Sequence, residues 1–331
     1  MKELLQRMFD HENLSRNEAR DVMLNIADGK YNDSQLAAFM TVFLMRSITT
    51  EELSGFRDAI LERRLPVEFD CDNAIDIVGT GGDGKNTFNI STASCFVVAG
   101  TGRKVVKHGN YGASSVSGAS NVLEYHGVKF TSDPTKLSES FDKSGVCYLH
   151  APFFSPALKS VATVRKSLAV RTFFNMLGPL VNPVLPKHQL LGVYNLKLMR
   201  LYSYIAQNEN IACTVVYSLD GYDEISLTSP FMVNGPFGEK IYQPEELGWK
   251  TVQHNNLWGG DTVAEAAKIF DNVLEGKATE PQENCVIANS AFALVTLEPQ
   301  LSLKEAKILA EESIKSGKAK KAFNKFCDIN R

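Results

Sequence analysis

The sequence predicts an α/β fold in two parts: a small N-terminal all-helical domain, then a larger α/β domain whose mixed, mostly parallel sheet is flanked by helices. Two observations predict this. Residues 1–66 show helical periodicity only, whereas from Ala74 onward short β-rich runs alternate with helical segments. A chain of 331 residues has room for about two domains. We therefore expect a helical domain over 1–70 and an α/β domain over 71–331.

The N-terminal block carries the stop and start signals of helices. Ser15-x-x-Glu18 and Thr49-x-x-Glu52 are capping boxes, and Gly29 is placed to end the helix that they bracket. Pro66 closes the block. One apolar helix face is predicted from residues at helical spacing: Leu36, Phe39, Met40, Phe43 and Leu44. The strands predicted further along are Ala74–Val78, Lys104–Lys107, Val146–Leu149, Leu190–Tyr194 and Cys213–Leu219.

Composition argues against several classes of protein. A net charge of −3 gives no overall basic field for nucleic acid or an anionic membrane. The six cysteines are scattered without a C-x-x-C pair, which favours reduced thiols in the cytoplasm. The N-terminus lacks the apolar core of a signal peptide, and no apolar run reaches the length of a membrane span. The locally basic tail, residues 316–325, is interpreted as the solvated face of a last helix with cations at its C-terminal end, with a nucleic-acid patch as the alternative.

The most informative segment runs from Ile75 to Thr92. A buried strand, Ile75 to Val78, leads into a loop with four glycines, and the loop ends at Asn89-Ile-Ser-Thr92 before an apolar helix. Glycines let backbone N–H groups approach an anion, and a helix N-terminus adds unpaired donors and a positive dipole end. The segment therefore predicts a phosphate cradle, with the Ser91 and Thr92 hydroxyls as further ligands.

Two other interpretations of this segment stay open. Gly79, Gly81 and Gly84 formally match the dinucleotide fingerprint G-x-G-x-x-G. That fingerprint needs a helix that opens inside the glycines and an acidic residue about 20 positions later. Here the helix is delayed, and the corresponding region, 102–107, holds no acid. A plain strand–helix turn without a ligand needs one or two glycines rather than four.

A second group of polar residues follows the next strand. Lys107-His108-Gly109-Asn110 stands at a strand's carboxyl end, where open α/β sheets bind ligands. Lys107 would supply a charge for phosphate, and Gly109 would permit close backbone approach. Residues 112–118 then offer small side chains and three hydroxyls, a second possible anion loop. The alternative for His108 is an ordinary packing histidine.

Asp223-Glu224 follows the strand Cys213–Leu219 and a turn. Mg2+ is usually held by one or two carboxylates together with substrate phosphates, so the pair and the cradle form a coherent combination. The alternative is a solvated acidic turn. We expect the pair to face solvent and to contribute little to packing.

The motifs together resemble those of the anthranilate phosphoribosyltransferase family, which has the nucleoside phosphorylase-like fold. The resemblance covers almost the whole chain in order and spacing. It rests on Gly79-Thr-Gly-Gly-Asp83, Thr87-Phe-Asn-Ile-Ser-Thr92, Lys107-His-Gly-Asn110, Ser114-Ser115, Arg171–Pro183 and Asp220-Gly-Tyr-Asp-Glu224.

The resemblance implies a reaction and its site residues. The reaction is transfer of the 5-phosphoribosyl group from 5-phosphoribosyl 1-pyrophosphate (PRPP) to anthranilate, a step of tryptophan biosynthesis. PRPP would be bound by Gly79, Gly82, Asp83, Thr87, Asn89, Ile90, Ser91, Thr92, Lys107, His108, Gly109, Asn110, Ser114, Ser115 and Ala119. Anthranilate would be bound by Gly79, His108, Asn110, Arg165 and Gly178, and Mg2+, two ions per chain, by Ser91, Asp223 and Glu224. No general base is assigned.

The resemblance also implies an architecture. A segment near residues 165–180 would pack back onto the helical domain, which would form a homodimer. Two rival functions are a nucleoside phosphorylase of similar fold and a non-catalytic relative that binds nucleic acid. The acidic pair counts against the first, because phosphorolysis needs no metal-bridged pyrophosphate, and it counts against the second together with the net charge.

The chain departs from the family pattern in the second loop. The family has Arg at the position of Tyr111, Lys at that of Val116, Ser at that of Ala119 and Asp at that of Asn121. Two cationic groups and one hydroxyl are therefore absent near the leaving pyrophosphate. We expect weaker or redistributed phosphate binding rather than lost activity.

Overall fold

The computed structural model describes residues 1–112, 115–236 and 238–331. Its contacts divide the chain into two compact units. One comprises Met1–Val67 with Ala151–Pro183, and the other Glu68–His150 with Val184–Arg331. The first unit is therefore discontinuous in sequence, because the middle segment Ala151–Pro183 belongs to it together with the N-terminal residues.

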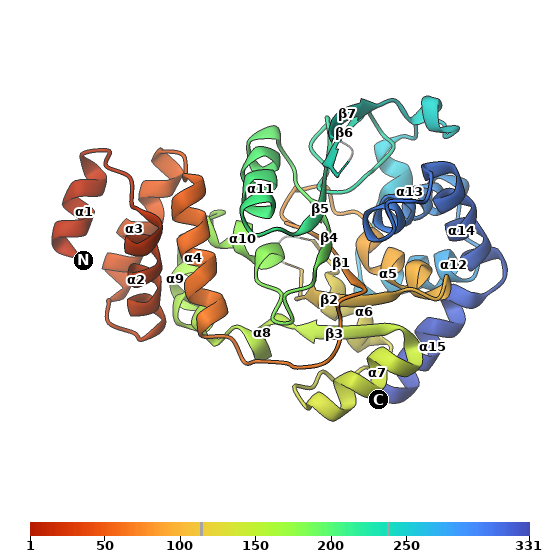
Figure 1. Ribbon diagram of the computed structural model, residues 1–331, viewed down its shortest axis with the longest axis horizontal. Coiled ribbons are helices and arrows are strands. Elements are labelled where there is room, and N and C mark those ends of the chain that lie inside the picture. Colours follow the sequence, from red (N-terminus) through yellow and green to blue (C-terminus); the bar gives the residue numbers. More distant parts are fainter. Residues whose placement is uncertain (113–114, 237) are drawn as a thin grey trace. The chain divides into compact units, whose positions relative to one another are not determined.

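The first unit is built from short helices (Figure 1), and α2, α3 and α4 begin at capping boxes. The predicted boxes at Ser15 and Thr49 are present, and a third, at Asn32, begins α3. Gly29 adopts φ +69° just beyond the end of α2, as a helix stop requires. The elements are α1 Lys2–Phe9, α2 Arg16–Ala27, α3 Asp33–Met45, α4 Thr50–Glu62, α8 Ala151–Phe154, η1 Pro156–Val161, α9 Ala162–Leu168, α10 Phe174–Leu177 and η2 Gly178–Leu180.

An aromatic cluster forms the core of this unit. Phe39 and Phe43 of α3 meet Phe56 of α4, and Phe173 of the middle segment stacks on Phe56 at 4.7 Å between ring centroids. The expectation for Leu44 was wrong, because its side chain is 47% exposed. At about 100° per residue it lies roughly a quarter-turn from the centre of the buried face.

The second unit contains one sheet in the described part of the chain, with strand order β3-β2-β1-β4-β5-β6-β7. The β1, β2, β3, β4 and β5 pairings are parallel, whereas β5–β6 and β6–β7 are antiparallel. The sequence analysis did not predict the strands β6 and β7. The strands are β1 Ala74–Gly79, β2 Lys104–Gly109, β3 Val146–His150, β4 His188–Gly192, β5 Ala212–Ser218, β6 Phe231–Gly235 and β7 Gly238–Tyr242.

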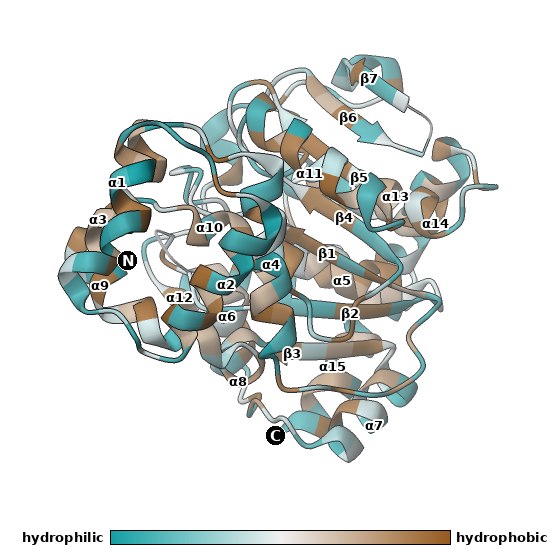
Figure 2. Ribbon diagram, turned by 60° about the vertical axis from the view of Figure 1, so that its left-hand side comes forward, coloured by the Kyte–Doolittle hydropathy of each residue, from teal (hydrophilic) through white to brown (hydrophobic). Residues whose placement is uncertain are grey.

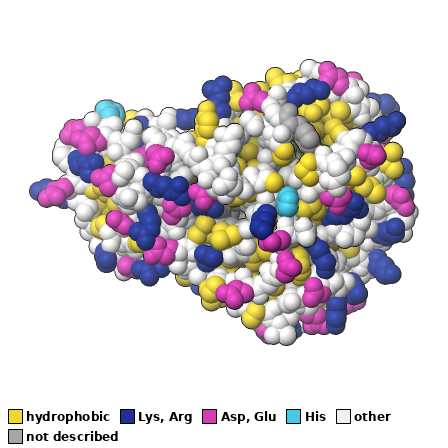
Figure 3. Space-filling model, in the orientation of Figure 1, with side chains coloured by type: hydrophobic (Ala, Val, Ile, Leu, Met, Phe, Trp, Pro, Cys, Tyr) yellow, Lys and Arg dark blue, Asp and Glu magenta, His cyan; other side chains and the backbone are white. Residues whose placement is uncertain are grey.

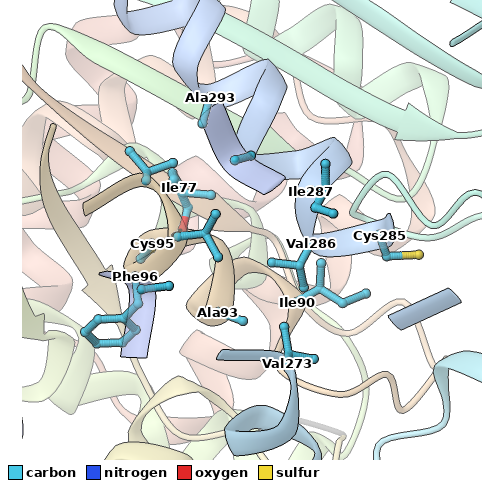
Figure 4. Close-up of a cluster of buried hydrophobic side chains, with 14 of the residues drawn as sticks. Ile77, Ile90, Ala93, Cys95, Phe96, Val273, Cys285, Val286, Ile287 and Ala293 are labelled. Carbon is cyan, nitrogen blue, oxygen red and sulfur yellow. Dashed lines mark hydrogen bonds between the residues drawn. The ribbon is translucent and has the colours of Figure 1, made fainter. Parts of the chain in front are cut away.

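Helices cover this sheet and supply most of its core. Figure 4 shows Ile90 of α5 close to Val286 and Ile287 of α13, and Ala93 and Phe96 of α5 belong to the same cluster of buried side chains. In Figure 2 the central strand β1 is largely brown, whereas the edge strand β7 is largely teal. The helical elements are α5 Ile90–Gly100, α6 Ala119–Tyr125, α7 Pro134–Ser144, α11 Leu196–Asn208, η3 Pro244–Leu247, η4 His254–Leu257, α12 Val263–Leu274, α13 Glu280–Leu297, α14 Leu303–Lys315 and α15 Lys318–Asn330.

The basic tail differs from the expectation. Gly317, at φ +72°, separates α14 from α15, so Lys318 and its neighbours begin a helix instead of ending one. Lys320 is compensated by carboxylates of α12, with its Nζ 2.7 Å from Asp271 and 3.1 Å from Glu275. Among the described residues, no helix is both long and apolar enough to cross a membrane.

The strand order places a topological switch point between β1 and β4. From β1 the chain winds outward through β2 and β3, and from β4 it winds in the opposite direction. In open α/β sheets the crevice at such a point, beyond the carboxyl ends of the strands, is where ligands bind. The glycine-rich loop leaves β1 at this place.

Candidate functional site

The glycine-rich loop leads from β1 to α5, as the sequence predicted. Gly81, Gly82 and Gly84 have φ of +66°, +70° and +79°, a region that favours residues without Cβ. The Asp83 carboxylate accepts a bond from the backbone N–H of Lys85, 3.0 Å away. The loop is therefore built from conformations that ordinary side chains disfavour.

The N-terminus of α5 faces an acidic side chain. Asn89 stands at the N-cap but makes no side-chain cap, and the backbone N–H of Ser91 donates to Glu224 Oε1 at 3.0 Å. The Thr87 hydroxyl donates to the other oxygen of Glu224, 3.4 Å away. A carboxylate here is stabilised by the positive end of the helix dipole.

Asp223 is held at the end of the sheet. Its Oδ2 accepts a bond from the backbone N–H of Gly81 at 2.6 Å and one from the Thr80 hydroxyl at 3.5 Å. A Cβ at Gly79 would collide with the Asp223 carboxylate, and one at Gly192 would collide with its carbonyl oxygen. These two strand-end glycines thus let the 219–228 segment cross the switch point.

The acidic pair is buried, so the expectation that it faces solvent was wrong. Asp223 is 7% exposed and Glu224 9% exposed. Burial, reinforced by the nearby Asp83 carboxylate, raises the pKa of both side chains above their usual range. Two neighbouring buried carboxylates are costly unless a cation joins them.

The segment that carries the pair is fixed by polar contacts that sequence reasoning missed. Asn289 of α13 exchanges bonds with the backbone of Ile225, at 3.1 Å for the N–H and 2.9 Å for the carbonyl. The Ser218 hydroxyl donates to the Glu224 carbonyl at 2.7 Å. The sequence did contain a signal, since Asn289 is an amide in a mostly apolar stretch of α13, residues 285–295, and its side chain is 3% exposed.

Lys107 lies beneath the cradle. Its side chain is 2% exposed, and Nζ donates to the Ile77 carbonyl at 2.6 Å and reaches the Ser91 hydroxyl at 3.5 Å. Its charge is therefore directed toward the start of α5 and lowers the pKa of Glu224 in part. His108 is 3% exposed, and its backbone N–H donates to Asp76 at 3.3 Å.

Gly109 and Asn110 lie at the carboxyl end of β2. A Cβ on Gly109 would press against the Tyr148 ring, so this position needs glycine for packing as well as for any ligand. Asn110 is exposed, and its Oδ1 accepts a bond from the backbone N–H of Tyr111 at 2.8 Å.

Asparagines hold the second loop. Asn89 Nδ2 donates to the Ser117 carbonyl at 3.0 Å, and the Ser117 hydroxyl donates to Asn89 Oδ1 at 3.3 Å. Asn121 Oδ1 accepts from both Gly112 and Gly118 backbone N–H groups, at 3.0 and 2.9 Å. Ser115 is half-buried, and the predicted contact at Ser114 lies outside the described residues.

Other predicted residues differ in how they could reach a ligand. Ile90 is fully buried and Thr92 is 2% exposed, so only a small part of either is accessible. Ala119 is half-buried at the first position of α6. Gly82 and Asp83 are half-buried in the loop.

Of the residues that depart from the family pattern, Tyr111 and Asn121 make contacts within the protein. The Tyr111 hydroxyl donates to Glu124 at 3.4 Å, and its ring meets the edge of His150 at 5.2 Å. Val116 is 38% exposed, and Asn121 closes the base of the loop. Burial lowers the pKa of His150 to about 4, so this histidine is neutral near pH 7.

Arg165 and Gly178 belong to the first unit. The Arg165 guanidinium lies over the Phe174 ring at 5.5 Å and donates to Asn175 Oδ1 at 3.4 Å. It forms no ion pair within the described parts of the chain, and burial lowers its pKa. A half-buried guanidinium without a carboxylate suits a carboxylate ligand. No atom lies within 4 Å of a Cβ added to Gly178, so packing does not require glycine there.

The donor set fits a divalent cation. Asp223 and Glu224 supply buried carboxylates, and the backbone N–H of Ser91 donates to Glu224, so Ser91 is the residue of α5 that lies next to this carboxylate. Oxygen ligands of this kind are those that Mg2+ prefers, and their raised pKa values show that the charges are poorly compensated without one.

Comparison with known proteins agrees with this fold. The model for "Glycosyl transferase family, helical bundle domain" matches residues 2–64, and that for "Glycosyl transferase family, a/b domain" matches residues 71–320. These matches define the class of the chain as a two-part glycosyl transferase. The anthranilate phosphoribosyltransferases of Bacteroides fragilis and Flavobacterium johnsoniae are 60% and 51% identical to it, each over 330 residues and 100% of both chains.

Solved structures agree as well. Anthranilate phosphoribosyltransferase from Thermus thermophilus matches with a TM-score of 0.92, at 31% identity over 99% of both chains. The Saccharomyces cerevisiae enzyme in complex with PRPP and Mg matches with a TM-score of 0.90, at 27% identity over 98% of this chain and 96% of that one. The chain belongs to the anthranilate phosphoribosyltransferase family. The resemblance, the enzyme class and the fold class predicted from the sequence are confirmed.

Proposed function

We propose that the protein transfers the 5-phosphoribosyl group of PRPP to the amine of anthranilate with Mg2+, giving N-(5-phosphoribosyl)anthranilate and pyrophosphate. One observation carries the proposal: a buried acidic pair stands against a glycine-rich loop and a helix N-terminus at the switch point of the sheet. That arrangement suits a metal-bound polyanion.

The proposal assigns the phosphoribosyl pyrophosphate to residues of the second unit. The first loop and the start of α5 would hold the phosphates, supported by Lys107 and the second loop. The proposed contacts are Gly79, Gly82, Asp83, Thr87, Asn89, Ile90, Ser91, Thr92, Lys107, His108, Gly109, Asn110, Ser114, Ser115 and Ala119. Ser91, Asp223 and Glu224 would hold Mg2+, for which we propose two ions per chain.

Anthranilate is assigned to Gly79, His108, Asn110, Arg165 and Gly178. Arg165 would bind the carboxylate of anthranilate, because its guanidinium is already oriented by Asn175 and Phe174 and lacks an ion-pair partner in the described residues. The domain assignment is part of this proposal: residues 1–70 with 165–180 as the helical domain and 71–331 as the PRPP-binding domain.

The reaction makes the C1–N bond of the product and breaks the C1–O bond to pyrophosphate. The aromatic amine has a usable lone pair, so the site needs no strongly shifted base, and no general base is assigned. The difficulty is departure of a polyanion from a carbon that becomes oxocarbenium-like. The loop amides, the α5 N-terminus and Lys107 would stabilise the leaving charge. When bound, Mg2+ neutralises charge on the pyrophosphate.

We also propose a homodimer formed through the helical unit. Phe9, Leu44 and Met45 are 54%, 47% and 84% exposed. Phe9 and Met45 line an open groove of about 390 Å³, which is formed by Met8, Phe9, His11, Ala38, Thr41, Val42, Met45 and Arg46. A second copy of the chain, meeting this face, would remove the apolar surface from water.

A cytoplasmic location is the last part of the proposal. All six cysteines are free, and five are buried. Thiols of this kind are typical of a reducing compartment. Charged side chains of both signs are interspersed on the face shown in Figure 3, as the net charge of −3 leads one to expect.

The fluorescence of anthranilate tests the proposed function. Addition of PRPP and Mg2+ to the protein with anthranilate should cause loss of anthranilate fluorescence, and chelation of Mg2+ by EDTA should stop it. Persistent fluorescence with all three components present would overturn the proposal.

A further inference from the structure

Asn86 connects the glycine-rich loop to two other segments. Its Oδ1 accepts a bond from the backbone N–H of Val116 in the second loop, 3.0 Å away. Its Nδ2 donates to the Gly260 carbonyl at 3.1 Å, and its own carbonyl accepts from the Gly259 N–H at 2.8 Å. One residue thus bonds to partners 30 and 174 positions away in sequence.

The backbone conformation of Asn86 is unusual for a residue with a side chain. Its φ is +47°, in the left-handed region that asparagine tolerates better than most non-glycine residues. Glycine would adopt this conformation more easily and would lack the amide group. The presence of asparagine at this position therefore indicates that the hydrogen bonds of its side-chain amide have a structural role.

The partners of Asn86 are themselves well anchored. Phe88 N–H donates to the Leu257 carbonyl at 3.1 Å, and Thr87 forms a bridge with Trp258, so residues 86–88 run beside 257–260. Gly260 leads into α12, whose N-cap, Thr262, accepts from the Glu265 N–H. This side of the connection is fixed to the helical layer.

We propose that Asn86 is a positioning residue that sets the glycine-rich loop and the second loop relative to each other for binding the phosphates of PRPP. The proposal deepens the proposed function and rests on it. The structure already places Asn89 as a link between the start of α5 and Ser117. Asn86 adds a link at the open part of the loop, three residues beyond Asp83. The partner of Asn86 in the second loop is the backbone N–H of Val116, a residue whose position is occupied by Lys in the family.

The test compares Asn86→Gly with Asn210→Gly. Asn210 is also an asparagine at positive φ, +53°, but it is exposed, and it stands before β5 and away from both loops in the chain. Both substitutions keep the backbone conformation, whereas only Asn86→Gly removes the two side-chain bonds. Steady-state kinetics with varied PRPP and varied anthranilate would be measured for the wild type and both variants.

Asn86→Gly should raise the KM for PRPP about three- to thirtyfold, the effect of one to two neutral hydrogen bonds. The KM for anthranilate and kcat should stay within about twofold, and Asn210→Gly should match the wild type. In hydrogen exchange, the peptide containing Val116 should lose protection in Asn86→Gly, while that containing Phe88 should keep it.

Two results would overturn the inference. One is an unchanged KM for PRPP in an active Asn86→Gly variant. The other is an equal loss in kcat and both KM values with a lowered Tm, which would make Asn86 merely structural. Absence of turnover in the wild type would instead refute the proposed function itself, so the two failures are distinguishable.

Discussion

Asp223→Asn should make the metal-free protein more stable and the enzyme inactive. Asn is isosteric with Asp and keeps an oxygen for the Gly81 N–H, which now donates to the carboxylate at 2.6 Å. Burial raises the pKa of Asp223 from 3.8 to about 7. At about 1.4 kcal/mol per pKa unit, ionising this group in the fold costs at most about 4 kcal/mol, and the amide avoids that cost.

The sign of the pH dependence follows from the raised pKa. The wild-type side chain is stabilising relative to the unfolded chain at low pH, and that contribution is lost as pH rises through about 7. In EDTA, the Tm of Asp223→Asn should therefore exceed that of the wild type by about 2–8 °C near pH 8.5 and by less near pH 6. Scanning fluorimetry measures this directly.

Asp142→Asn is the matched control. Asp142 is 70% exposed, with its nearest cation, Lys104, at 3.9 Å, so its replacement should change Tm little at either pH. The reasoning is refuted if Asp223→Asn is less stable than the wild type in EDTA near pH 8.5, or if it retains near-normal turnover with saturating Mg2+.

Three further predictions follow from the same site. Mg2+ should bind more tightly near pH 8 than near pH 6, and should release protons, because the carboxylates of Asp223 and Glu224 have raised pKa values without the metal. Calorimetry in two buffers of different ionisation enthalpy would detect the protons, and an Mg2+ affinity independent of pH would contradict the prediction. Arg165→Ala should raise the KM for anthranilate about ten- to hundredfold and hardly change that for PRPP; equal effects in steady-state kinetics would make Arg165 structural. Ala119→Ser should tighten PRPP binding by about 0.5–1.5 kcal/mol in titration calorimetry, and unchanged or weaker binding would show that position 119 does not reach the ligand.

Local signals in the sequence were sufficient for much of the fold. The capping boxes at Ser15 and Thr49 and the strand runs before the loops each act through neighbours in the chain, so these elements are present near the predicted positions. The fourth strand is displaced: it was expected over Leu190–Tyr194 and runs from His188 to Gly192. The strand β6 was missed because its apolar run, Phe231 to Val233, is only three residues long. The strand β7 was missed because its side chains are mixed and mostly exposed, without the apolar run of a buried strand. The prediction that Leu44 belongs to the buried helix face was wrong because helical spacing defines a face only to about a quarter-turn.

Long-range contacts decided what the sequence could not predict at the site. The burial of Asp223 and Glu224 depends on glycines at the ends of β1 and β4 and on Asn289, which is more than sixty positions away. A turn with adjacent carboxylates looks solvated until the sheet order is known. The role proposed for Asn86 likewise could not be predicted from the sequence, because it depends on hydrogen bonds to Val116 and Gly260, which are distant in the chain.

The most direct test of the central claim follows the consumption of one substrate and the release of one product in the same reaction. With protein, anthranilate, PRPP and Mg2+, the loss of anthranilate fluorescence and the release of pyrophosphate should proceed together in a one-to-one ratio, as transfer to the amine requires. Chelation of the metal should stop both, as should Asp223→Asn. Fluorescence loss without pyrophosphate, pyrophosphate release without anthranilate, or full activity in EDTA would contradict the account.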